Sequence, residues 1–144
     1  MALTQQQLEK LRQVRMFVLD MDGTIYLGES LFPFTKGFLR RVEETGRDFC
    51  FFTNNSSKNR EAYLEKLARM GISLPPEKML ISNGVILQWL GQHHPGARCY
   101  VVGTPALRED FRKAGFAPDA EDGDVVVLGF DTTLCLLYTS DAAD

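Results

Sequence analysis

The chain has 144 residues, a formal net charge of -3 and 44% hydrophobic residues. This length fits one domain, or one domain with part of another, and the composition is that of an ordinary globular protein. Charges of both signs are interspersed, so no basic surface for nucleic acid or for a membrane is expected. The amino terminus is too polar for a signal peptide, no apolar run reaches transmembrane length, and three scattered cysteines form no metal-binding or disulfide pattern. We therefore expect a protein of the reducing cytoplasm.

Short apolar segments alternate with amphipathic ones along the chain. The apolar runs predict strands at 16–19, 49–52, 79–81, 99–102 and 125–128, the first of them buried on both faces. Residues 27–34 predict a hairpin or flap. Helical spacing and stop signals predict a helix ending at Gly46, one capped by Ser56 or Ser57 and ending at Gly71, one that follows Ser82, and one over 105–114. The segment 94–96 is the best candidate for a domain boundary.

This alternation predicts an α/β fold with a parallel sheet and right-handed crossovers. Chemistry in such sheets lies at the carboxyl ends of the strands. Asp20 and Thr53 each fall at the end of a predicted strand. Polar groups at the ends of two consecutive buried strands therefore indicate a functional site.

An acidic pair follows the first predicted strand. In Asp20-Met21-Asp22-Gly23-Thr24 two carboxylates lie two residues apart on a turn, so both can point into one small volume. Like charges repel there unless a cation lies between them, and oxygen ligands are those that Mg²⁺ prefers. Asp20 is the candidate nucleophile on phosphorus, and Asp22 the candidate general acid and base. The alternative is a simple turn in which Gly23 avoids a steric clash.

A polar segment follows the second predicted strand. In Thr53-Asn54-Asn55-Ser56-Ser57 a hydroxyl and two amides precede a helix amino terminus, where unpaired backbone N–H groups face a ligand. The segment is a candidate anion site. The alternative is a plain helix cap, which Ser and Asn favour in any case.

Together these motifs resemble those of the haloacid dehalogenase (HAD) superfamily, and more narrowly of its subfamily IIA, the NagD and p-nitrophenylphosphatase group. Residues 18–26 are similar to the first motif of that group and residues 52–56 to the second, and residues 80–84 and 100–103 also resemble the subfamily. The resemblance covers most of residues 14–134. It implies a Rossmann-like HAD core with a parallel sheet in residues 1–96 and the beginning of an inserted α/β cap domain in residues 97–134.

The resemblance implies a Mg²⁺-dependent phosphatase that hydrolyses small phosphate monoesters through an aspartyl-phosphate intermediate. Asp20 would be the nucleophile and a metal ligand, and Asp22 the general acid and base, with its backbone carbonyl on the metal. Thr53, with Asn54 and Asn55, would hold the phosphate. The substrate would be a sugar phosphate, phosphoglycolate or a nucleotide monophosphate. The resemblance leaves open a homo-oligomer formed through the cap of the complete protein.

Two later motifs of the family, a lysine and a second acidic pair, are not found in this sequence. Gly123-Asp124 precedes a strand and lacks a second acid, and Asp131 is interpreted as structural. Lys58 and the pair His93 and His94 are interpreted as surface residues.

The last ten residues, 135–144, match the translation of a transposase-end sequencing adaptor. The readable sequence would then end at Leu134, inside the cap. We expect the 144-residue chain by itself to be nearly inactive and poorly folded, because metal and phosphate would lack part of their binding groups.

Three other functions stay open. A phosphotransferase or mutase would use the same Asp20 chemistry. A signalling receiver domain requires an acid after its third strand, where this chain has Ser82-Asn83. A non-catalytic Rossmann-like binding module is the third, although no glycine-rich nucleotide loop supports it.

Overall fold

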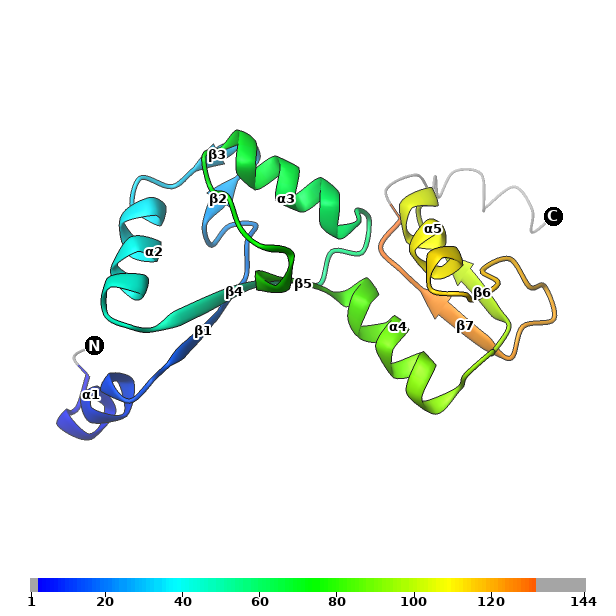
Figure 1. Ribbon diagram of the computed structural model, residues 1–144, viewed down its shortest axis with the longest axis horizontal. Helices are drawn as coiled ribbons and strands as arrows, with labels where there is room; N and C mark the ends of the chain where they lie inside the picture. Colours follow the sequence, from blue (N-terminus) through cyan, green and yellow to red (C-terminus); the bar gives the residue numbers. More distant parts are fainter. Residues whose placement is uncertain (1–2, 132–144) are drawn as a thin grey trace, which may run out of the picture. The chain divides into compact units, whose positions relative to one another are not determined.

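The computed structural model describes residues 3–131 (Figure 1). Its elements in chain order are α1 (Gln5–Arg12), β1 (Met16–Leu19), β2 (Tyr26–Leu27), β3 (Ser30–Leu31), α2 (Thr35–Glu44), β4 (Asp48–Thr53), α3 (Arg60–Arg69), a 3-10 turn (Pro76–Lys78), β5 (Met79–Ile81), α4 (Ser82–His93), β6 (Cys99–Val102), α5 (Pro105–Lys113) and β7 (Val125–Leu128). All the predicted strands form, and β4 is one residue longer at each end. No helix among these residues is long and apolar enough to cross a bilayer.

The strand pairing confirms the predicted α/β class. Strands β1, β4 and β5 form one sheet in the order β1-β4-β5, and β1 and β4 are parallel. Strands β6 and β7 form a second, two-stranded parallel sheet. Strands β2 and β3 pair antiparallel as the predicted hairpin.

Contacts divide the chain into two compact units. The first extends to residue 52 and includes residues 64–80. In its sheet Phe17 pairs with Phe49 and Leu19 with Phe51, so these side chains share one face. The Phe17 ring meets Phe38 of α2 edge to face at 5.8 Å, and α2 also buries Leu39 and Val42, as its helical spacing predicted.

The prediction that β1 is buried on both faces is wrong. Met16 and Val18 are 49% and 63% exposed, whereas Phe17 and Leu19 between them are partly buried. Helix α2 covers the side with Phe17, and in the described part of the chain no element covers the side with Val18. An apolar run in the sequence was therefore not sufficient to predict that both faces of the strand are covered.

Two helices differ from the sequence prediction, one in its start and one in its presence. Helix α3 begins at Arg60, and the Asn59 side chain accepts a hydrogen bond from the Ala62 N–H at 3.0 Å, so Asn59 caps it in place of Ser56 or Ser57. Helix α1 was not predicted at all. A sequence signal for it exists, because Thr4 and Gln7 form a reciprocal capping box.

The second unit comprises residues 53–63 and 81–131 of the part of the chain that the structure describes. Helices α4 and α5 pack against the β6-β7 sheet. Its core consists of Leu90, Cys99, Val101, Leu107, Phe111 and Phe116. Helix α4 therefore packs with β6, and the division of the chain into core and cap at 94–96 stays a prediction. The interpretation of residues 135–144 as an adaptor translation lies outside the described residues.

Candidate active site

The acidic pair lies where the sequence predicts it, directly after β1. Asp20 and Asp22 are exposed, whereas Met21 between them is 1% exposed. The buried methionine anchors the turn, and both carboxylates remain accessible to solvent. Among residues 3–131 no side-chain hydrogen bond or ion pair engages either carboxylate, and both are available to a cation or a substrate.

Backbone hydrogen bonds close the turn tightly. The Met21 carbonyl accepts the N–H groups of Thr24 at 3.1 Å and Ile25 at 2.9 Å, and the Gly23 N–H donates to the Tyr26 carbonyl at 2.8 Å. Gly23 has φ of 75°, in the left-handed region that favours glycine. The glycine of the motif is therefore required by the backbone.

The register of the sheet determines where the turn stands relative to β4. Because Leu19 pairs with Phe51 in a parallel register, β1 and β4 end at the same edge of the sheet. Asp20 is the first residue after β1, and Phe52 follows Phe51 in β4. The acidic turn thus occupies the carboxyl edge that parallel sheets use for chemistry.

Thr53 ends β4 and begins the polar loop, which belongs to the second unit. Thr53 is buried, and its Oγ1 accepts the Asn55 N–H at 3.2 Å. Asn55 Oδ1 in turn accepts the Ser57 N–H at 3.0 Å and the Ser57 hydroxyl at 2.6 Å. Thr53 Oγ1 is the acceptor in this bond, so the bond does not use the hydroxyl proton of Thr53.

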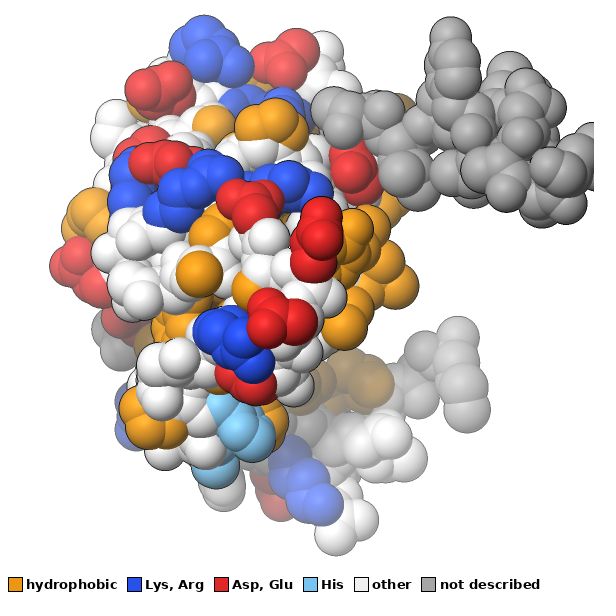
Figure 2. Space-filling view, turned by 90° about the vertical axis from the view of Figure 1, so that its right-hand side faces the viewer, with side chains coloured by type: hydrophobic (Ala, Val, Ile, Leu, Met, Phe, Trp, Pro, Cys, Tyr) orange, Lys and Arg blue, Asp and Glu red, His pale blue; other side chains and the backbone are white. Residues whose placement is uncertain are grey.

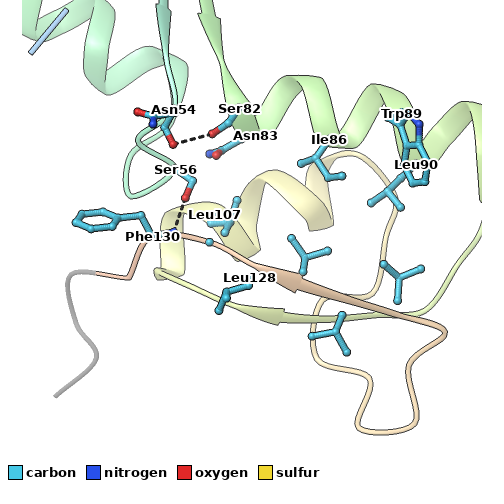
Figure 3. A pocket seen from close by; sticks show the side chains of 14 residues that line it. Asn54, Ser56, Ser82, Asn83, Ile86, Trp89, Leu90, Leu107, Leu128 and Phe130 are labelled. Carbon is cyan, nitrogen blue, oxygen red and sulfur yellow. Dashed lines mark hydrogen bonds between the residues drawn. The ribbon is translucent and has the colours of Figure 1, made fainter. Parts of the chain in front are cut away.

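Contacts from distant residues hold this loop in place (Figure 3). The Ser82 hydroxyl donates to the Asn54 carbonyl at 3.2 Å, and the Phe130 N–H donates to Ser56 Oγ at 2.6 Å. The Thr104 hydroxyl donates to the Ser57 carbonyl at 3.1 Å. Sequence reasoning did not identify these three anchors, since their separations of 28 to 74 residues leave no local pattern.

A cavity of about 530 Å³ opens beside the loop. Figure 3 shows side chains of α4 on one side of it and β7 on the other. Asn54, Ser56 and Ser82 give it one polar end, and the rest is mainly apolar. The buried Asn83 also lines the cavity and donates to Asp110 Oδ2 at 2.9 Å.

The metal-binding donors near the turn are incomplete within the described residues. No group of three or more His, Cys, Asp or Glu side chains capable of holding a metal occurs among residues 3–131. Asp20 and Asp22 supply oxygen donors only, which suits Mg²⁺. The donor chemistry fits a magnesium ion that completes its octahedral shell from water, substrate or further ligands.

The other residues singled out in the sequence lie on the surface. Lys58, His93 and His94 are exposed, as predicted. In Figure 2 acidic and basic side chains are interspersed on the face shown, without a large patch of one sign. Asp124 pairs with Arg98 at 3.1 Å. This ion pair accounts for Asp124 without a catalytic role.

Comparison with known proteins identifies the same family as the motifs do. A family model described as haloacid dehalogenase-like hydrolase matches residues 17–117. An acid sugar phosphatase of Staphylococcus aureus is 31% identical over 122 residues, which are 84% of this chain and 47% of that protein.

Two solved structures are similar. A 4-nitrophenylphosphatase from Thermotoga maritima is 38% identical with a TM-score of 0.82, and the match covers 92% of this chain and 51% of that one. A putative NagD protein is also 38% identical, with a TM-score of 0.80 and coverage of 90% and 51%. The chain thus spans about half the length of these relatives. With the family model matched over most of its length and the acidic turn at the sheet edge, the chain belongs to the haloacid dehalogenase-like hydrolases.

Proposed function

We propose that the protein to which this chain belongs hydrolyses small phosphate monoesters, with Asp20 as the nucleophile. The observation that carries the proposal is the exposed Asp20–Asp22 turn at the carboxyl edge of the parallel β1-β4 pair. The relatives named as a 4-nitrophenylphosphatase and an acid sugar phosphatase support phosphate esters as the substrate class. A sugar phosphate, phosphoglycolate or a nucleotide monophosphate would meet this description.

In the first step an Asp20 carboxylate oxygen attacks phosphorus, and the bond from phosphorus to the ester oxygen breaks. The Asp22 carboxyl gives its proton to that oxygen, so the alcohol leaves neutral. In the second step Asp22 takes a proton from water as the water oxygen attacks phosphorus, and the bond from phosphorus to the Asp20 oxygen breaks. Phosphate is released and Asp20 is regenerated.

Thr53 and Asn54 would hold the phosphoryl group. The bond to Asn55 does not use the Thr53 hydroxyl proton, and Asn54 is exposed. Asn55 would contribute its amide nitrogen, because its Oδ1 is engaged by Ser57. Such donors stabilise negative charge as it redistributes in the transition state.

The Asp20 carboxylate and the Asp22 backbone carbonyl would hold Mg²⁺. A bound Mg²⁺ would supply positive charge that allows two carboxylates to lie near a phosphate dianion. We assign the enzyme to the reducing cytoplasm, where the described cysteines, Cys50 and Cys99, would stay free thiols.

The test is phosphate release from 4-nitrophenyl phosphate and from sugar phosphates, with and without Mg²⁺, by the protein expressed from its source gene. Asp20→Asn should lower turnover by about 10³-fold or more, because the nucleophile is lost. Glu43→Gln, on the exposed side of α2, is the matched control and should leave turnover unchanged. Full activity of Asp20→Asn would refute the assignment, and activity only with an added alcohol acceptor would identify a phosphotransferase.

A further inference from the structure

One buried cation of the first unit has no part in the proposed chemistry. Lys66 on α3 is only 8% exposed, although lysine is rarely buried without a partner. Its Nζ lies 4.0 Å from the centroid of the Tyr26 ring and 3.9 Å from Glu29 Oε1. Tyr26 and Glu29 belong to the β2-β3 hairpin segment, which directly follows the acidic turn.

The aromatic ring is the more important of the two partners. The Glu29 carboxylate is 68% exposed, lies beyond hydrogen-bond length and is shared with Arg69, so water screens the pair. The Tyr26 ring is 1% exposed, and a desolvated ring face attracts an ammonium more strongly than an exposed one. The Tyr26 ring is therefore the stronger of the two partners of the Lys66 ammonium.

The backbone of Tyr26 closes the acidic turn. Its carbonyl accepts the Gly23 N–H at 2.8 Å, and its N–H donates to the Met21 carbonyl at 3.4 Å. Asp22 and Tyr26 also form an isolated bridge. The residue whose ring contacts Lys66 is therefore also the residue whose backbone bonds close the Asp22–Gly23 segment.

We propose that Lys66 is a positioning residue of the acidic turn, acting through Tyr26. Its ammonium fixes the ring, the ring fixes the Tyr26 backbone, and this backbone fixes the direction of the Asp20 and Asp22 carboxylates. The catalytic meaning rests on the proposed function. The structural link from Lys66 to the Gly23 amide does not.

The structural link is tested by hydrogen exchange of the Gly23 amide in the protein expressed from its source gene. Lys66→Met keeps the length of the side chain without its charge and should accelerate this exchange about tenfold. Lys66→Arg retains a cation for the ring and should restore slow exchange. Arg69→Met is the matched control, because Arg69 shares Glu29 but is 63% exposed, and it should change nothing.

The Ile72 amide, bonded to Leu67 at the end of α3, is the internal reference. Equal acceleration at Ile72 and Gly23 would mean general destabilisation and would overturn the proposal, as would unchanged exchange at Gly23. If Lys66→Met does not fold, NMR chemical shifts of the Lys66 protons test the contact between Lys66 and the Tyr26 ring. The Lys66 ε-methylene protons must show an upfield ring-current shift that Tyr26→Leu removes, and its absence overturns the proposal.

Kinetics separate this proposal from the proposed function. If both hold, Lys66→Met lowers kcat about tenfold with KM within about twofold, because the turn is misplaced while phosphate binding persists. Lys66→Arg recovers most of kcat. If Asp20→Asn leaves turnover intact, the proposed function fails, and the Gly23 exchange result still decides the link to Lys66.

Discussion

At the scale of single residues, the acidic turn depends on one position without a side chain. Gly23 has φ of 75°, yet open space surrounds the place where a Cβ would stand. Backbone conformation therefore excludes other residues here, and crowding does not. Gly37 of α2 offers the contrast, since it has ordinary helical φ and equally open surroundings.

Gly23→Ala should lower the free energy of unfolding by about 1–2 kcal/mol, because an alanine is strained in the left-handed region. Gly37→Ala should raise it by about 0.5–1 kcal/mol, since alanine favours a helix over glycine. Urea unfolding of both variants checks the pair. Equal effects of the two substitutions would contradict the backbone explanation.

At the scale of elements, one side chain joins the polar loop to a helix. Thr104 is buried at the start of α5, where its Oγ1 accepts the Leu107 N–H at 3.3 Å and its hydroxyl donates to the Ser57 carbonyl. The same threonine thus caps α5 and anchors the loop that follows β4. A cap whose hydroxyl also has a distant acceptor leaves two groups unsatisfied when it is removed.

Thr104→Ala should therefore destabilise the protein by about 1–2 kcal/mol, and Thr104→Ser by much less. Thermal or urea unfolding measures the stability. Hydrogen exchange at Leu107 shows whether the loss begins at the helix start. Equal stability of the alanine and serine variants would exclude the hydroxyl as the cause.

A second element-scale feature joins the residue before β6 to the residue before β7. The Arg98 guanidinium hydrogen-bonds the Asp124 carboxylate, and the Arg98 backbone N–H adds a further bond at 3.1 Å. Together they hold the pKa of Asp124 below its ordinary value of 3.8. The contribution of Asp124 to stability is therefore complete above its unfolded pKa and is lost as pH falls below about 4.

In Asp124→Asn the free energy of unfolding should fall less steeply as pH decreases from about 4 to about 2. Near neutral pH its dependence on pH should match that of the unsubstituted protein. Urea midpoints measured across this range test the expectation. Since the pair is exposed, added salt should reduce the effect. If Asp124→Asn loses stability at low pH as steeply as the unsubstituted protein, other carboxylates cause that loss.

At the scale of the whole molecule, apolar side chains remain on the surface of each unit. Val18 in the first unit and Val126 and Leu128 in the second are 63%, 70% and 81% exposed. Parallel sheets normally have both faces covered. In the described residues, these strand faces are therefore exposed apolar surfaces, which favour association.

The 144-residue chain by itself should therefore self-associate, and Leu128→Lys should reduce this association without lowering stability. Light scattering against concentration provides the measurement. The buried Leu107→Lys is the contrasting variant and should unfold the second unit. If Leu128→Lys leaves the association unchanged, the surface that mediates association does not lie on β7.

Turnover of 4-nitrophenyl phosphate by the same 144-residue chain should be at least about tenfold below that of a complete relative, because metal and phosphate would lack later binding groups. The comparison uses equal enzyme and Mg²⁺ concentrations. Turnover within about tenfold of the relative would show that residues 1–144 already contain a working site.

The sequence alone determined the positions of most strands and of the acidic turn. Short apolar runs bounded by polar residues specify strands locally, so β1, β5, β6 and β7 were predicted to the residue. The placement of Asp20 directly after a strand also needed only local pattern. For the same reason a helix such as α1, which buries nothing, was detectable only through its capping box.

The tertiary structure decided what local pattern cannot encode. Whether β1 is covered on one face or two depends on the elements that pack on it, and not on its own residues. Ser56 Oγ accepts the N–H of Phe130, which is 74 residues away in sequence, and Asn59 is the residue that caps α3. The sequence pattern made no prediction for Lys66, and only the fold brings the buried Tyr26 ring close to its ammonium. Distant partners decide burial and hydrogen bonding, and these are set when the chain packs.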